Sequence, residues 1–144
     1  MRMNSDITHY DDCIVFLMAK AYQKAYGNLK KRLAAYGITP VQSLILAVLW
    51  EADGLLTAGE IGKKLTLDGA TLSGALNRMA DNGWIVKQTD RDDRRRLLID
   101  LSDRARSLSD ALCLARDQAN DDILKHLRLE EKLLLKRLLR DVHG

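Results

Sequence analysis

Residues 70–81 combine small side chains with side chains that form hydrogen bonds. On a helix with about 100° per residue, seven of them share an arc without any bulky apolar group: Ala70, Thr71, Ser73, Gly74, Asn77, Arg78 and Asp81. Such a face can approach another surface closely and still offer donors and acceptors, as a DNA major groove about 12 Å wide requires. Asn77 could pair with adenine and Arg78 with guanine or phosphate, whereas Thr71 and Ser73 suit phosphates.

A second candidate group is the charged turn at residues 90–96, which reads DRDDRRR. It concentrates four arginines, and arginines suit the negative charge of DNA. A solvated turn with internal ion pairs would have the same composition, because Asp90, Asp92 and Asp93 nearly balance the arginines. We favour DNA binding because the turn follows closely after the polar helix.

Other chemistry has little support in the sequence. His9, His126 and His143 are scattered, and no spacing supplies two metal ligands with a third. No serine or cysteine has a predicted base beside it, and there is no glycine-rich phosphate loop. We therefore expect no enzymatic activity, no metal ion and no cofactor.

The ends and composition of the chain favour a cytoplasmic location. The first residues, MRMNSDITHYDD, do not resemble a signal peptide, and the run ILAVLW is too short to span a bilayer. We therefore expect no membrane partner. Two cysteines in 144 residues do not make a disulfide framework. The net charge of +3 is mild for a nucleic-acid-binding protein, so the local distribution of charge carries the argument.

The polar arc fits the second helix of a helix-turn-helix unit. A T-x-x-E capping pattern at residues 57–60 starts a short helix, and about three residues separate it from the next one, for which Asp68 is a natural N-cap. The inner positions are Ala58, Ile61 and Leu65 on the first helix and Leu72, Ala75, Leu76, Met79 and Ala80 on the second. Residues 85–89 and 97–101 then alternate as two strands around the charged turn. This order predicts a winged helix-turn-helix.

Helices on both sides of this unit complete the predicted fold. Thr39 to Gln42 forms a capping box with proline in the first turn, and the expected buried stripe behind it is Val41, Leu44, Ile45, Val48 and Leu49. A helical pattern begins at Asp12 and stops at Gly37. One long helix opens at Ser102 and Asp103, with the inner face Ala105, Leu108, Leu112, Ala115, Ala119 and Ile123.

The last segment, residues 129–142, carries leucine on too many sides for a lone surface helix. The terminal helices thus need burial that the compact middle cannot supply, and a homodimer provides it. The expected fold class is mainly α with a small β-hairpin. We divide the chain into an N-terminal dimerisation helix (1–36), a winged helix-turn-helix DNA-binding domain (37–101) and C-terminal dimerisation helices (102–144).

Residues 37–105 resemble the MarR (multiple antibiotic resistance regulator) family of transcription regulators. The resemblance lies in the order of four features: the I-T-x-x-Q helix start, the G-W-I entry to the first strand, the D-x-R wing tip and the L-S before the long helix. It implies a homodimer on a palindromic operator in double-stranded DNA, with a recognition helix in the major groove and a wing arginine in the minor groove. It also implies a repressor that a small phenolic or lipophilic ligand releases.

The family pattern assigns roles to individual residues of this sequence. The DNA-facing positions of the recognition helix match Gly69, Ala70, Thr71, Ser73, Gly74, Asn77 and Arg78. In the wing, Asp93 and Arg95 form the D-x-R pair with Arg94 between them, and Arg91 lies in the same tip. The aspartate would brace the loop while an arginine enters the narrow minor groove.

Two alternatives remain open. The segments DDCIVFL, VLWEADG and LDGATLSGALNRM are similar to the organic hydroperoxide-sensing branch of the family, which implies a redox sensor at Cys13. That branch has a tyrosine where this sequence has Pro40, and a buried structural cysteine is the simpler reading; Cys113 is a second cysteine on the long helix. In the other alternative, the winged helix is a protein-interaction module that never touches DNA.

Overall fold

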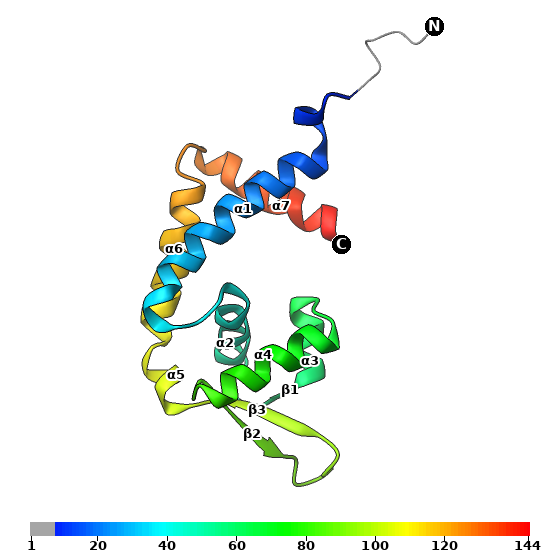
Figure 1. Ribbon diagram of the computed structural model, residues 1–144, viewed down its shortest axis with the longest axis vertical. Coiled ribbons are helices and arrows are strands. Elements are labelled where there is room, and N and C mark those ends of the chain that lie inside the picture. The colour runs from blue at the N-terminus through cyan, green and yellow to red at the C-terminus, as the bar shows by residue number, and fades with distance from the viewer. Residues whose placement is uncertain (1–7) are drawn as a thin grey trace, which may run out of the picture.

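The computed structural model describes residues 8–144, so the first seven residues of the predicted N-terminal region lie outside the described residues. The terminal helices lie at one end of the folded molecule, and the winged helix-turn-helix with its sheet lies at the other end (Figure 1). The fold is mainly helical with one small sheet, as the sequence predicts. Among the described residues no single helix is long and apolar enough to span a membrane; Ile14–Tyr36 with Pro40–Glu51 passes that test only as a pair bent by 74°.

The N-terminal helix begins two residues later than the sequence pattern suggests. A short 3-10 helix, η2 (Tyr10–Asp12), comes first, and Cys13 is extended before α1 (Ile14–Leu33). The N–H of Cys13 donates to the carbonyl oxygen of Tyr10 at 3.3 Å, which closes the 3-10 turn and holds Cys13 at the N-cap. At the other end η3 (Ala34–Tyr36) leads to Gly37, whose φ of 71° makes the predicted stop.

Helix α2 (Pro40–Glu51) starts with the predicted capping box. The hydroxyl of Thr39 accepts from the N–H of Gln42 at 3.2 Å, and the Gln42 side chain accepts from the N–H of Thr39 at 3.1 Å. The predicted buried stripe is partly wrong, because Leu44 is 43% exposed whereas Leu46 is fully buried. The reason is that α2 contacts five other elements: α1, α3, α4, β3 and α6. Its buried residues therefore do not form one narrow stripe.

The helix-turn-helix follows the prediction closely. The Thr57 side chain caps α3 (Ala58–Leu65) by accepting from the N–H of Glu60 at 3.1 Å. Thr66, with φ of 54°, turns the chain towards Asp68, which caps α4 (Gly69–Asp81). On α4 the apolar arc enters the core, where Leu72, Ala75, Leu76 and Met79 are all at most 4% exposed. The opposite arc therefore faces outwards.

The wing is part of a three-stranded sheet rather than an isolated hairpin. β2 (Ile85–Thr89) pairs antiparallel with β3 (Leu97–Leu101), as predicted, in the register Ile85↔Leu101 and Thr89↔Leu97. β1 (Leu56–Thr57) adds to the other edge of β3, giving the order β1-β3-β2. Two residues are too few to show a strand pattern in a sequence, so only the pairing partner reveals this strand.

The predicted single long helix is wrong, because the chain contains two helices at that point. α5 (Asp103–Ser107) ends at Leu108, whose φ and ψ are −100° and 4°, and α6 (Ser109–Ile123) begins after it. The N–H of Leu108 is shared between the carbonyl oxygens of Arg104 and Ala105, at 3.2 and 3.3 Å. The Ser107 hydroxyl also donates to the Arg104 carbonyl oxygen, at 2.8 Å. Side-chain competition for a backbone acceptor is a common cause of bent helices.

Helices α1 and α6 pack side by side, and polar contacts join them (Figure 1). The amide of Asn28 donates to the carboxylate of Asp122, and Arg32 donates to Asn28 at 2.8 Å and to Gln118 at 3.4 Å. The Asn28 contact, with the nearby charge of Lys125, holds the pKa of Asp122 below its ordinary value. The last helix, α7 (Leu129–His143), contains no buried residue.

Candidate nucleic-acid interface

The N-terminus of α4 is fixed by Asp68. Its carboxylate accepts from the N–H of Thr71 at 2.8 Å and from the Thr71 hydroxyl at 2.8 Å. The backbone contact is the larger cause, and the two together lower the pKa of Asp68 below its ordinary value. The Thr71 hydroxyl proton is thus already engaged, so a phosphate contact through it requires the exchange of this hydrogen bond.

The seven candidate residues of α4 lie along its outward side, as the arc predicts. Gly69, Ala70, Thr71, Ser73, Asn77 and Arg78 are exposed, and Gly74 is half-buried. The cover over Gly74 is the guanidinium of Arg78, one turn further along the helix. A Cβ at position 74 would lie 3.4 Å from Nη1 of Arg78. Arg78 therefore lies back along its own helix and is not extended from it.

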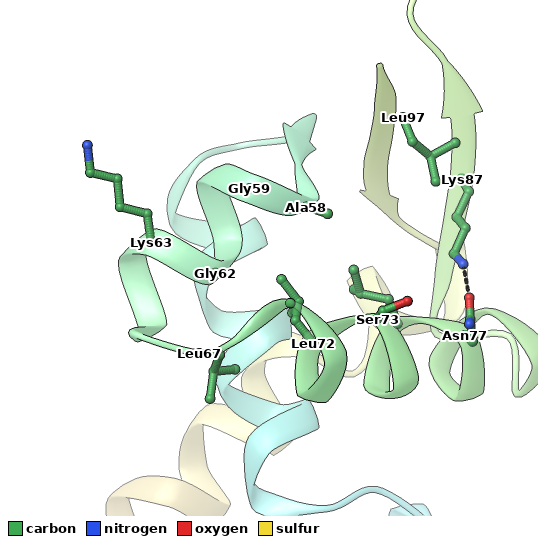
Figure 2. A pocket seen from close by; sticks show the side chains of 12 residues that line it. Ala58, Gly59, Gly62, Lys63, Leu67, Leu72, Ser73, Asn77, Lys87 and Leu97 are labelled. Atoms are coloured by element: carbon green, nitrogen blue, oxygen red, sulfur yellow. Dashed lines mark hydrogen bonds between the residues drawn. The ribbon is translucent and has the colours of Figure 1, made fainter. Parts of the chain in front are cut away.

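Asn77 has a partner that sequence reasoning missed. Nζ of Lys87, on β2, donates a hydrogen bond to Oδ1 of Asn77 (Figure 2). The alternation of β2 puts Lys87 on the same side as the buried Ile85, but nothing in the sequence says that α4 packs against that side. The contact therefore depends on tertiary packing.

The wing tip is ordered by its own aspartates. Oδ1 of Asp93 accepts from the N–H of Arg95 at 3.1 Å and from Nε of Arg95 at 3.2 Å, so the D-x-R pair makes direct contact. The Arg95 side chain is still 92% exposed. Arg91 and Arg94 are exposed and line a hollow at the tip with Thr89 and Asp90.

Arg96 is a further residue missing from the sequence-based site. Its guanidinium lies 3.8 Å from the carboxylate of Asp90, at the end of β2, and 3.5 Å from that of Glu60, on α3. It thus connects the base of the wing to the first helix of the helix-turn-helix. The run of three arginines suggested charge, but only the fold separates Arg96, which faces the protein, from Arg94 and Arg95.

A hollow of about 380 Å³ lies between α3, α4 and the sheet (Figure 2). Small and apolar residues of α3 and α4, with Leu97 of β3, form most of its wall. Lys63 and Lys87 lie at opposite sides, and Figure 2 shows Lys87 directed towards Asn77 and Lys63 directed away. The outward face of α4 and the wing are thus parts of one continuous surface.

Both cysteines are half-buried thiols without a disulfide. Cys13 lies at the N-cap of α1. Cys113, on α6, accepts a hydrogen bond at its sulfur from Nη2 of Arg116, at 3.2 Å, and Nη1 of the same arginine donates to the Ser43 carbonyl oxygen at 3.3 Å. Within residues 8–144, no three histidine, cysteine, aspartate or glutamate side chains are grouped so as to hold a metal ion.

Comparison with known sequences relates the chain to a family of regulators. A family model described as MarR family matches residues 36–96. The chain is 40% identical over 94 residues to the HTH-type transcriptional regulator TtmR of Methylorubrum extorquens. That match covers 65% of this chain but 46% of TtmR, so the chain spans about half the length of this relative. It is 31% identical over 103 residues to the organic hydroperoxide resistance transcriptional regulator of Bacillus subtilis, covering 72% of this chain and 69% of the relative.

Solved structures show the same fold. A probable transcriptional regulator from Pseudomonas aeruginosa superimposes with a TM-score of 0.87 at 31% identity, over 93% of this chain and 99% of that one. Overoxidized AbfR bound to DNA gives 0.73 at 28% identity, over 90% of each chain. A MarR mutant from Escherichia coli complexed with operator DNA gives 0.83 over 96% of this chain and all (100%) of that one; at 22% identity this likeness concerns the fold alone.

Proposed function

Because this chain belongs to the MarR family of transcription regulators, we propose that it works as a homodimeric, sequence-specific DNA-binding repressor. Residues 37–101 form the DNA-binding domain, and the segments 1–36 and 102–144 form the dimerisation region. The observation that carries the proposal is the exposed face of α4, which holds small and hydrogen-bonding side chains next to the arginines of the wing. That combination suits a recognition helix in the major groove with a basic loop in the neighbouring minor groove.

The contacts on DNA divide by chemistry. On α4, Asn77 and Arg78 carry the groups that can read base edges, whereas Ser73 and the N-terminal turn of the helix suit phosphates. In the wing, Arg94 and Arg95 enter the minor groove, and the Asp93 contact holds the loop in the required shape. Arg91 adds positive charge at the tip.

A second copy of the chain is the proposed cover for the terminal helices. Six large apolar residues of α7 are between 43% and 70% exposed: Leu129, Leu133, Leu134, Leu138, Leu139 and Val142. The first half of α1 likewise exposes Ile14, Val15, Leu17, Met18 and Tyr22. Both helices lie at the end of the folded molecule that is away from the wing (Figure 1). A two-fold dimer through this end leaves both wings uncovered, and its two recognition helices can meet half-sites about 34 Å apart.

Release by a small lipophilic or phenolic ligand is the proposed regulation. A hollow of about 210 Å³ opens between α1, α2 and α6, and its lining includes Tyr22, Tyr26, Leu29, Leu44 and Ile123. Two tyrosines among aliphatic residues suit a small ring with one polar group. Because the hollow lies where the dimerisation helices meet α2, a ligand there favours dimers with a different spacing of the recognition helices.

Oxidation of Cys13 is a second candidate for the switch. The observation in its favour is that Cys13 is a free, half-buried thiol at the N-cap of α1, in a chain that is 31% identical over 103 residues to the organic hydroperoxide resistance transcriptional regulator of Bacillus subtilis. If this switch operates, the Cys13→Ser variant keeps operator binding but no longer leaves DNA on treatment with an organic hydroperoxide. Peroxide-induced release that persists in the variant assigns Cys13 a structural role.

The proposed function is tested with the purified chain and a pool of random DNA duplexes. Selection is expected to enrich a palindrome whose half-sites are one helical turn apart, and sedimentation is expected to give a dimer. A stable monomer contradicts the proposal. A dimer that retains no DNA at low salt supports a protein-interaction module instead.

A further inference from the structure

Three successive carbonyl groups at the C-terminal end of α4 accept hydrogen bonds from the start of α5. The carbonyl oxygen of Asn82 accepts from Nη1 of Arg104 at 3.0 Å. The carbonyl oxygen of Gly83 accepts from the Ser102 hydroxyl at 2.7 Å, and that of Trp84 accepts from the Ser102 N–H at 3.1 Å. The carbonyl groups at the end of a helix have no partner within that helix, so Arg104 satisfies a group that α4 itself leaves free.

Arg104 makes a second contact, with a buried side chain. Its guanidinium carbon lies 4.1 Å from the centroid of the Trp84 ring. Trp84 is 2% exposed and belongs to the hydrophobic core. A guanidinium is attracted to the face of an indole ring, and its planar group of donors leaves an N–H free for the Asn82 carbonyl oxygen. One side chain of α5 thus contacts both the end of α4 and the core beside it.

The short helix α5 connects the winged helix-turn-helix to the proposed dimerisation region. It follows β3 directly, and α6 begins after Leu108, where the chain leaves helical geometry (Figure 1). Of its five residues, Ala105 is buried. So short a helix has little packing surface of its own. Its direction relative to α4 therefore depends on the hydrogen bonds and the ring contact of Ser102 and Arg104.

In the proposed dimer, the direction of α5 and α6 sets where the two recognition helices stand relative to each other. One base pair inserted between two half-sites moves one of them by about 3.4 Å along the DNA and turns it by about 35° around the axis. A dimer with a firm junction between α4 and α5 resists that change. A dimer with a loose junction can follow it, because each α4 can adjust to its own half-site.

We propose that Arg104 is a positioning residue for DNA binding, which holds α4 to α5 and thereby makes the dimer require one spacing between the two half-sites. The inference rests on the proposed function as a dimeric DNA-binding regulator. It concerns the spacing of half-sites and not their base sequence, because Arg104 contacts the Asn82 backbone and the Trp84 ring, which do not belong to the exposed face of α4.

The test compares full-length wild type, Arg104→Ala and Arg104→Lys on four DNA duplexes. One carries the palindrome that the wild type selects, two carry the same palindrome with one base pair inserted or removed at its centre, and one carries a single half-site. Fluorescence anisotropy at low salt gives the affinities.

The wild type should bind the selected palindrome more tightly than the two altered ones. In Arg104→Ala this ratio of affinities should be roughly 3- to 10-fold smaller, as expected for the loss of a cation–π contact and a hydrogen bond. Affinity for the single half-site should stay at the wild-type value, whereas damage to α4 or loss of a phosphate contact would lower it. Arg104→Lys should remain close to wild type, because an ammonium group also donates and can also lie over the ring.

Arg106→Ala is the matched control on the same helix. Arg106 contacts the carboxylate of Asp100 at 2.7 Å, only six residues away in the sequence, whereas Arg104 and Asn82 are 22 residues apart. The turn from β3 into α5 already keeps Asp100 and Arg106 close together. The control thus removes the same charge without freeing α4, and it should distinguish the spacings as the wild type does. Thermal denaturation checks that every variant is folded.

Three results overturn the inference while DNA binding stands. The first is an Arg104→Ala protein that distinguishes the spacings as strictly as the wild type, and the second is an Arg106→Ala protein that relaxes the requirement equally. The third is an Arg104→Ala protein that loses as much affinity for the single half-site as for the palindrome. A wild-type protein that enriches no palindrome instead overturns the proposed function, and the inference falls with it.

Discussion

Replacement of Arg94 and Arg95, at the tip of the wing, tests most directly whether the wing of this chain binds DNA. Arg94 is exposed and makes no ion pair within residues 8–144, and Arg95 has only the exposed contact to Asp93, at 3.2 Å. An exposed ion pair contributes about 1 kcal/mol at most, so Arg95 can exchange it for DNA at little cost. We expect Arg94→Ala/Arg95→Ala to weaken operator binding and to flatten its dependence on salt.

The size of the effect follows from counterion release. If each wing neutralises one or two phosphates, a dimer loses two to four, and each changes the slope of log K against log salt by about 0.9. The slope should therefore become shallower by roughly 2 to 4. When the salt concentration rises from about 50 to about 200 mM, the affinity of both proteins for the operator falls. The factor by which it falls should be roughly 10 to 150 times smaller for the variant than for the wild type.

Fluorescence anisotropy with an operator duplex at several salt concentrations measures both quantities. The control is Lys30→Ala/Lys31→Ala, which removes two charges from the last turn of α1, away from the wing (Figure 1). That variant should keep the wild-type slope. If the dimeric arginine variant binds with wild-type affinity and slope, the wing takes no part in DNA binding.

Three further predictions concern packing, assembly and pH. Gly62→Leu places a Cβ 3.2 Å from Cδ2 of Leu72 and 3.4 Å from the Leu67 carbonyl oxygen, with further side-chain atoms beyond it; because overpacking costs about 1–3 kcal/mol and leucine regains only about 1 kcal/mol over glycine in a helix, the variant should be less stable in urea unfolding, and an unchanged midpoint contradicts tight packing of α3 against α4. Leu133→Asp puts a charge on a side chain that is 61% exposed on α7; it should yield monomers in sedimentation and weaken operator binding, and an intact dimer excludes α7 from the interface. The pKa of Asp68 in the folded chain lies below its ordinary value of 3.8, so its cap stabilises the fold above about pH 4 and is lost as pH falls through the lowered pKa. Asp68→Asn, which caps without a charge, should lack this part of the acid sensitivity in thermal unfolding at different pH values.

Structural features that depend on residues close together in the sequence could be predicted from the sequence. The capping box at Thr39, the caps at Thr57 and Asp68 and the stop at Gly37 each involve groups within about one helical turn. Periodicity likewise separated the buried arc of α4 from its exposed arc, because one packed helix has one inner side. These features were sufficient to predict the fold class and the face of α4 on which the candidate residues lie.

The remaining features depend on contacts between helices and strands that are distant in the sequence, so only the tertiary structure determines them. The β1 strand exists through its pairing with β3, and Leu46 is buried while Leu44 is exposed because several elements surround α2. At Leu108 the chain leaves helical geometry, and the Ser107 hydroxyl and the Leu108 N–H share the Arg104 carbonyl oxygen there, which a regular apolar pattern does not show. Within the candidate interface, packing of α4 against β2 brings Lys87 to Asn77, and the docking of the wing turns Arg96 towards Glu60. Residue types and local spacing therefore supplied the chemical groups of the surface, but the contacts that orient them join residues distant in the chain.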